Sequence, residues 1–285
     1  MSEYNFALHT YPFSLIVSNR SNYLYDAVKQ LYPATVLGPI APDTVYDFDL
    51  KVERRWLGLR SDYYVGSASE HFRMTNKAHL PAIFEWAFNW SIASFQHHYL
   101  AFHAAVLQKG DVSIILPAEP GAGKSTLSAL LMLQGWRLLS DETCLIDLQS
   151  AEIVPCVRPV SLKNKSLDVV RQRYPAAAMA LNIPDTIKGT VGYLLPTTIS
   201  WHGYQQSCVA THIIFPRYDS DCYSTIFAPV SLGQGIMQLI NNSFNYSVLG
   251  AEGFAALSQL CRTVTMLQLT YADTDEALSL LEKLS

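Results

Sequence analysis

The chain has 285 residues, 49% of them apolar, which is enough to bury one large hydrophobic core or two smaller ones. Its net charge of -4 and sequence pI near 6.0 give no basic surface of the kind that binds nucleic-acid phosphates, so we expect no nucleic-acid partner. The five cysteines are odd in number and form no C-x-x-C pair, which argues against both a disulfide framework and a zinc site.

From the sequence we expect neither an export signal nor a membrane span. Its opening, MSEYNFALHT, contains an acidic residue and no apolar run of signal-peptide type. The most apolar helical stretch, residues 79–95, is interrupted by Glu85 and Asn89 and predicts no membrane span. We therefore expect a cytoplasmic protein with reduced cysteines.

The first hundred residues predict strands and two helices. Aromatic and β-branched residues at 4–17 indicate one or two strands, and strand-like runs follow at 45–53 and 63–74. Ser21 is placed to cap a helix that runs through Leu31.

A second, longer helix is predicted near Pro81, because apolar residues recur there at helical spacing and proline suits a first turn. This helix leads into a strand at 99–107, so we place a boundary near residue 98. The chain is then divided into a smaller N-terminal α/β region of unassigned role, residues 1–98, and a second domain, residues 99–285.

The end of the chain predicts scaffold elements. Residues 252–262 indicate a helix and residues 263–271 a strand. Asp273 and Glu276 have the spacing of a capping box for a last helix that ends at Leu284.

The segment VSIILPAEPGAGKST predicts a strand followed by a phosphate-binding loop. Such a loop directs backbone N–H groups toward one point at a helix N-terminus, where the helix dipole also favours an anion. The pattern matches G-x-x-x-x-G-K-[ST] except that Ala118 stands at the first glycine. The alternative is a glycine-rich turn before an ordinary helix. We predict a nucleotide-binding P-loop made by Pro120, Gly121, Ala122, Gly123, Lys124, Ser125 and Thr126.

The predicted ligands of this loop are ATP and Mg²⁺. Lys124 can reach the β- and γ-phosphates, and the hydroxyl of Ser125 can ligate the Mg²⁺ that bridges them.

A pair of acids follows the loop. The strand-like WRLLS comes after Gly135 and ends in Asp141 and Glu142, which lie 17 and 18 residues beyond Lys124. If this strand lies beside the strand at 112–118, its carboxyl end emerges next to the loop. One carboxylate, with Asp141 as the candidate metal ligand, can hold Mg²⁺, and the other can accept the proton of an incoming hydroxyl.

His103 stands in the strand before the loop, 21 residues ahead of Lys124. A lone histidine in a strand is more often a hydrogen-bonded core residue than a catalytic one. However, the order of the three features along the chain, His103, then the loop, then the acid pair, resembles the order in the catalytic domain of HPr kinase/phosphorylase.

Longer segments carry a closer resemblance, which spans most of the chain. They resemble the HPr kinase-related proteins called HprK-related kinase A, often linked with peptide-modification gene clusters. The segments are FEWAFNWSIASFQHHYLAFHAAVL, RPVSLKN, KGTVGYLLP, FPRY and NSFNYSVLGAEGF.

This resemblance implies an HPr kinase-like P-loop fold and an ATP-dependent serine kinase whose partner is a protein or peptide with an acceptor serine. It leaves open whether the chain forms a homo-oligomer. The site residues it implies are Lys124 and Ser125 for nucleotide and metal, Asp141 and Glu142 as the acid pair, His103, and Arg217 near the acceptor phosphate.

The chain also departs from the HPr kinase pattern. Glu142 stands where that family has the aspartate that acts as general base, so Asp141 and Glu142 both stay candidates for the base. The family's glutamate metal ligand has no counterpart in CVRPVSLKN, and Arg158, Lys163 and Lys188 are candidates to neutralise phosphate charge instead. The first 75 or so residues show no resemblance to the N-terminal domain of HPr kinase.

We therefore expect an ATP- and Mg²⁺-dependent phosphotransferase that phosphorylates a hydroxyl, in first place a serine of a protein or ribosomal precursor peptide. The alternatives are a kinase of a small hydroxylated metabolite and a non-catalytic nucleotide-binding scaffold in a peptide-modification pathway.

Overall fold

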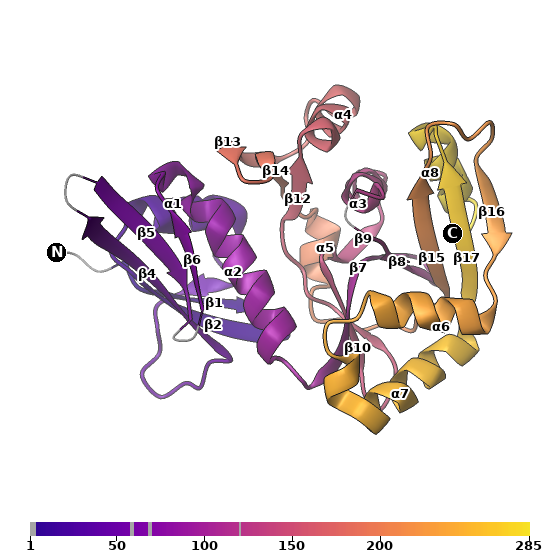
Figure 1. Ribbon diagram of the computed structural model, residues 1–285, viewed down its shortest axis with the longest axis horizontal. Helices are drawn as coiled ribbons and strands as arrows, with labels where there is room; N and C mark the ends of the chain where they lie inside the picture. The colour runs from indigo at the N-terminus through magenta and orange to yellow at the C-terminus, as the bar shows by residue number, and fades with distance from the viewer. Residues whose placement is uncertain (1–3, 58–59, 68–69, 120) are drawn as a thin grey trace.

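The computed structural model describes residues 4–57, 60–67, 70–119 and 121–285, and within them the protein is a mixed α/β structure built on three sheets (Figure 1). Its N-terminal part contains β1 (Phe6–Thr10), β2 (Phe13–Asn19), α1 (Asn22–Leu31), β3 (Leu37–Gly38), β4 (Phe48–Leu57), β5 (Arg60–Gly66), β6 (His71–Met74), the 3-10 turn η1 (Lys77–His79) and α2 (Leu80–Phe95). The rest contains β7 (Tyr99–Lys109), β8 (Val112–Pro117), α3 (Lys124–Leu133), β9 (Arg137–Ser140), β10 (Thr143–Asp147), β11 (Ile153–Val154), β12 (Val160–Lys163), α4 (Lys165–Arg173), β13 (Met179–Thr186), β14 (Gly189–Leu194), α5 (Thr198–His202), β15 (His212–Tyr218), β16 (Ile226–Pro229), α6 (Leu232–Asn241), α7 (Tyr246–Thr263), β17 (Thr265–Tyr271) and α8 (Thr274–Glu282).

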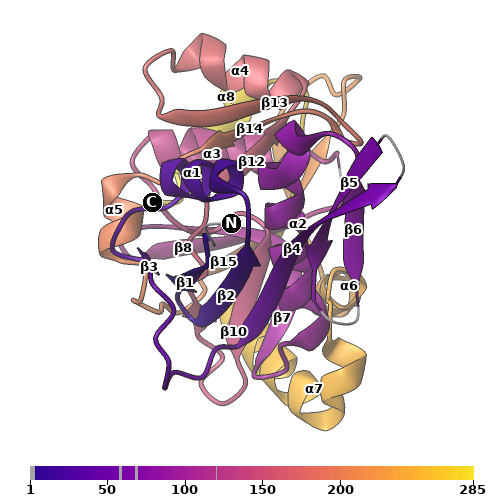
Figure 2. The same cartoon turned by 90° about the vertical axis from the view of Figure 1, so that its left-hand side faces the viewer.

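The first sheet belongs to the N-terminal part and has the strand order β3-β1-β2-β4-β5-β6. Figure 2 shows β1, β2 and β4 side by side on the outer side of the molecule. Buried and half-buried residues alternate along β2, because one face of the sheet packs against helices. Helix α1 meets this face with Leu24, Val28 and Leu31, whose spacing puts them on one side of the helix.

The central sheet has the order β11-β10-β7-β8-β15-β17-β16, with β9 also paired to β7. Strands β8, β15 and β17 run parallel, and β8 is buried along nearly its whole length, as expected of a strand covered on both faces. Helices α3 and α8 cover one face, and α6 and α7 cover the other. The carboxyl end of β8 therefore opens into the start of α3 at one edge of a fully covered sheet.

Strands β9 and β10 run in line along the same edge of β7. Ser140 pairs with Val106 and Thr143 with His103, so the pairing advances by the same step on both strands. Asp141 and Glu142 lie between the two strands and outside the ladder, and within β9 the register shifts at Leu139, which has no partner on β7. The break between β9 and β10, which follows this irregularity, is what turns the two acids out of the sheet. We call residues 140–143 the bend.

The expectation that the strand after Gly135 lies beside the strand of residues 112–117 is wrong. That strand, β9, pairs with β7, which lies between it and β8. Because β7 runs antiparallel to both, β8 and β9 still point the same way. Their carboxyl ends therefore reach the same edge of the sheet, one strand apart.

Other predicted elements are found close to their expected ends. Helix α1 ends at Leu31 and α2 begins at Leu80, one residue before the proline that was expected to start it. The helix predicted at 252–262 begins earlier, at Tyr246, and is kinked at Gly250, whose φ is 56°.

The third sheet, β12-β14-β13, was not predicted. It lies between the N-terminal part and α3 in Figure 1. The boundary at residue 98 stays a prediction. One hydrophobic core extends across it and joins Phe84 and Phe88 of α2 to Leu145 and Tyr193. None of the helices in the described ranges combines the length and apolar character that a membrane span needs.

A buried ion pair fastens α2 to the segment before β12. The Arg158 guanidinium contacts the Glu85 carboxylate at 2.5 Å, and both side chains are less than a tenth exposed. Tyr32 donates its hydroxyl to Glu85 at 2.7 Å, and the guanidinium lies 4.2 Å from the ring centroid of Phe88. A charge removed from water this completely is tolerated only while its partner remains.

Arg158→Met should therefore lower the free energy of unfolding by about 3–5 kcal/mol, because it leaves the Glu85 carboxylate buried without a cation. Guanidinium denaturation monitored by tryptophan fluorescence measures this. The control is Arg173→Met, whose partner Asp275 is exposed, and its effect should stay within about 1 kcal/mol. Equal losses in the two variants would contradict a structural ion pair, and Glu85→Gln added to Arg158→Met should recover part of the loss.

Candidate functional site

The turn from β8 into α3, residues 118–123, is shaped by two glycines in the left-handed region. Gly121 has a φ of 95° and Gly123 a φ of 88°, a conformation that side chains other than glycine rarely adopt. Gly123 is constrained a second time, because a Cβ atom there would overlap the hydroxyl of Tyr271. That hydroxyl lies 3.4 Å from the carbonyl oxygen of Ala122, within hydrogen-bond reach. We call residues 118–123 the glycine loop; Pro120 lies outside the described residues.

The glycine loop presents unused donors at the start of α3. Within the described part of the chain, the N–H groups of Gly121, Gly123, Lys124 and Ser125 donate to no acceptor. The first N–H groups of a helix have no partner inside the helix and carry the positive end of its dipole. An anion that enters here meets several donors at once.

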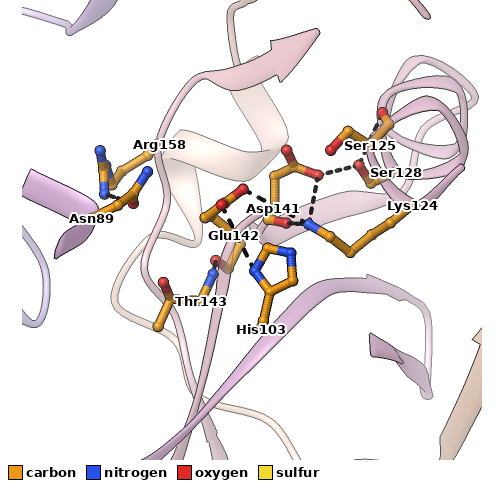
Figure 3. Close-up of polar contacts among 10 residues, drawn as sticks. Asn89, His103, Lys124, Ser125, Ser128, Asp141, Glu142, Thr143 and Arg158 are labelled. Carbon is orange, nitrogen blue, oxygen red and sulfur yellow. Dashed lines mark hydrogen bonds and ion pairs between the residues drawn. The ribbon is translucent and has the colours of Figure 1, made fainter. Parts of the chain in front are cut away.

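Lys124 opens α3 and carries a buried ammonium. Its side chain is 6% exposed, and its Nζ donates a hydrogen bond to the carbonyl oxygen of Asp141. The same nitrogen lies 3.9 Å from Asp141 Oδ1 and 3.9 Å from Glu142 Oε2 (Figure 3). The predicted convergence of this lysine with both acids is therefore present in the structure.

Asp141 is held in place by Ser128. The Ser128 hydroxyl donates to Asp141 Oδ1 at 2.6 Å and lies 3.2 Å from the carbonyl oxygen of Ser125. With only 5% of its side chain exposed, Asp141 is confined between α3 and the bend. Ser128 was missed from the sequence, although it follows Lys124 by four residues and so lies on the same face of the helix.

Glu142 is the more accessible acid. Its side chain is 37% exposed, and its Oε1 lies 3.7 Å from His103 Nδ1. Desolvation raises the pKa of Glu142, but the charges of Lys124, His103, Lys163 and Lys188 outweigh it, so the net shift of the pKa is downward. Glu142 is therefore ionised at neutral pH.

His103 lies on β7, opposite Thr143 of β10. Desolvation is the main cause that lowers its pKa, and the charge of Lys124 lowers it further against the opposing effect of Glu142. The imidazole is therefore neutral at pH 7. Its ring packs against Phe244 at 6.1 Å between centroids, which helps fix its orientation beside Glu142.

Other residues proposed from the sequence lie outside this cluster. The Thr126 hydroxyl donates to Ser166 of α4 at 2.9 Å and so points away from Lys124. Arg217, at the end of β15, is 69% exposed on its side chain and lies 3.5 Å from Asp219. Arg158 is engaged by Glu85 and is not available to a phosphate at Lys124.

The acids also border a small pocket between α2 and the third sheet. Its walls include Trp86, Asn89, Lys163 and Lys188 besides Glu142. In Figure 3 Glu142 lies between Lys124 and His103 on one side and Arg158 and Asn89 on the other. One face of Glu142 is thus turned toward the glycine loop, and the other toward this pocket.

The donors at this site suit Mg²⁺ only in company with phosphate oxygens. No group of three or more His, Cys, Asp or Glu side chains converges in the residues that the structure describes. Mg²⁺ usually binds through one or two carboxylates, waters and substrate phosphates, so Asp141 and the Ser125 hydroxyl make a sufficient protein share. Ser128 links the two residues, since its hydroxyl contacts Asp141 Oδ1 and the backbone carbonyl oxygen of Ser125.

Comparison with protein-family models and with curated protein sequences finds no match for this chain.

The two glycines of the loop make a matched test of its geometry. Gly121→Ala should cost about 1–2 kcal/mol of stability, because alanine is strained at positive φ, and a Cβ there meets nothing within 4 Å. Gly123→Ala should cost more, because its Cβ also overlaps the Tyr271 hydroxyl. Chemical denaturation measures both.

Tyr271→Phe removes the overlapping oxygen and supplies the control. Added to Gly123→Ala, it should bring the loss of stability close to that of Gly121→Ala. If it leaves the loss unchanged, the close approach of Tyr271 to the loop is not the cause.

Proposed function

We propose that this chain is an ATP- and Mg²⁺-dependent phosphotransferase with an HPr kinase-like P-loop fold, and that it phosphorylates the hydroxyl of a serine in a protein or peptide. The observation that carries the proposal is the convergence of the Lys124 ammonium, the free N–H groups of the glycine loop and an ionised Glu142 on one edge of the sheet. Phosphoryl transfer needs this combination of anion binding, charge neutralisation and an oriented proton acceptor.

The glycine loop and Lys124 bind the phosphates. The N–H groups of Gly121, Gly123, Lys124 and Ser125 can donate hydrogen bonds to phosphate oxygens without breaking any bond in the described residues. The Lys124 ammonium sits between these donors and the acids, where it can neutralise charge on the β- and γ-phosphates.

Asp141 and Ser125 are the residues that would ligate the metal. Mg²⁺, when bound to the phosphates, neutralises negative charge on the group that is transferred. Asp141 suits this side because Ser128 and Lys124 hold it rigidly against α3. Its burial also keeps it away from an incoming acceptor.

Glu142 is the better placed of the two acids to accept the proton. It is ionised, more exposed than Asp141, and borders the pocket from which a hydroxyl can enter. His103 lies 3.7 Å from the carboxylate, where its ring can hold Glu142 in position. The role of Arg217 at the acceptor phosphate stays a prediction.

Two other functions fit parts of this site. A kinase of a small hydroxylated metabolite would use the same residues on a different acceptor, and a nucleotide-binding scaffold would use the loop without the proton acceptor. The distance of 3.9 Å between Lys124 Nζ and Glu142 Oε2 favours phosphoryl transfer over nucleotide binding alone. Binding of phosphate does not require an ionised acid beside the lysine.

The test is transfer from labelled ATP with Mg²⁺ to serine-containing peptides and to free L-serine, beside measurement of ATP affinity. Glu142→Gln should lower the transfer rate by about 10²- to 10⁴-fold, because it removes the proton acceptor, with little change in ATP affinity. Lys124→Met should weaken ATP binding itself.

Lys165→Met is the matched control, because Lys165 is an exposed lysine at the start of α4. It should change neither quantity. ATP binding with no labelled product from any acceptor would favour the scaffold, and label only in L-serine would favour the metabolite kinase. Transfer that is unaffected by Glu142→Gln would contradict the role of this acid.

A further inference from the structure

The pocket beside Glu142 is closed on three sides by parts of the chain that lie far apart in sequence. Helix α2 forms one wall with Trp86 and Asn89, the third sheet forms another, and the bend with Asp141 and Glu142 forms the floor. Its water-accessible volume is about 30 Å³, enough for about two water molecules. A carboxylate or a hydroxyl fits such a space, and an aromatic ring does not.

Two lysines bring uncompensated positive charge to this pocket. Neither Lys163 nor Lys188 has a carboxylate within 4.0 Å among the described residues. Lys188 lies over the ring of Trp86, with its Nζ 4.5 Å from the ring centroid. Desolvation and the nearby charge of Lys163 lower the pKa of Lys188, against the opposing effect of Glu142.

The other acids of the pocket are already neutralised. Glu85 is paired with Arg158, and Asp141 is held by Lys124 and Ser128. Glu142 is left as the one carboxylate shared between Lys124 on the loop side and the two pocket lysines. Lys163 and Lys188 are therefore the cations of the pocket that have no carboxylate within 4.0 Å among the described residues.

Two buried hydroxyls line the same pocket without partners. Tyr193 Oη and Ser161 Oγ are inaccessible to solvent and form no hydrogen bond in the described part of the chain. The two residues pair directly across β12 and β14, so their side chains lie on the same face of the third sheet. Lys163, two residues after Ser161, is on that face as well.

An unpartnered buried hydroxyl costs free energy, on the order of 1–3 kcal/mol. Burial raises the pKa of Tyr193, so its phenol stays protonated and able to donate. Two residues with unpartnered hydroxyls and two with cations line one small space, which is the pattern of a site for an oxyanion.

We infer that this pocket binds a carboxylate that the acceptor carries next to the hydroxyl that is phosphorylated. That the ligand is the phosphoryl acceptor rests on the proposed function. Repulsion from Glu142 directs the anion toward Lys163 and Lys188, which leaves the neighbouring hydroxyl facing Glu142. The N-terminal part of the chain is then a component of acceptor recognition, because α2 supplies one wall.

The anionic group can come from an acidic residue beside the serine in a peptide, or from the carboxylate of free serine itself. Two matched pairs of probes separate these sources. The first pair is a labelled Gly-Gly-Ser-Glu-Gly-Gly peptide and its Ser-Gln counterpart, both amidated at the C-terminus. The second pair is L-serine and L-serinamide, measured as competitors of the labelled peptide.

Affinities are measured by fluorescence anisotropy on the full chain at low salt and without ATP, so the result does not depend on catalysis. We expect the anionic member of at least one pair to bind about tenfold more tightly than its amide, as a charge-assisted contact predicts. The pair that discriminates identifies the source of the anion. The proposed function is tested separately by the transfer assay, in which it fails if no label moves from ATP to an acceptor.

The double variant Lys163→Gln/Lys188→Gln should reduce this preference to less than about threefold, and Tyr193→Phe should weaken binding of the anionic probe without affecting its amide. Lys165→Gln, a neighbouring exposed lysine outside the pocket, should leave the preference intact. The proposal is overturned if neither pair is discriminated, or if the preference survives in the double lysine variant.

Discussion

The buried ammonium of Lys124 is the constraint on which the site depends. A lysine that is only 6% exposed is tolerated because carboxylate oxygens of Asp141 and Glu142 each lie 3.9 Å from its nitrogen. To bring both acids there, the strand along β7 has to break between β9 and β10, and Ser128 has to hold Asp141 against α3. The glycine loop then places unused N–H groups beside this charge cluster. The break between β9 and β10 and the fixed position of Asp141 thus meet one electrostatic requirement.

A second buried ion pair connects this centre to the N-terminal part. Arg158 and Glu85 fix α2 against the third sheet, and α2 in turn closes the pocket that borders Glu142. The hydrophobic core is continuous through the same place, since Phe84 and Phe88 pack in one cluster with Tyr193. The N-terminal part is therefore tied into the site by burial as well as by charge, which gives a physical reason for its presence in the chain.

The local features of the site could be predicted from the sequence, and the long-range ones could not. Gly121, Gly123 and Lys124 follow from a loop pattern in which each residue type has a steric or electrostatic reason. Ser128 was within reach, because helical spacing alone puts it beside Lys124. By contrast, Tyr271 approaches Gly123 from 148 positions away (271 − 123), and the pairing of β9 with β7 is decided by sheet register. Ser161 pairs with Tyr193 in the third sheet, which no local sequence pattern predicted.

The central claim is that Lys124 and the two acids surround the same end of a bound triphosphate. The structure of the full chain with a non-hydrolysable ATP analogue and Mg²⁺ tests this most directly. The account predicts the terminal phosphate within about 3 Å of Lys124 Nζ and of the glycine-loop N–H groups, with the metal on the Asp141 side and Glu142 facing the free side of that phosphate. A triphosphate bound away from the glycine loop, with Lys124 still hydrogen-bonded to the carbonyl of Asp141, would contradict it.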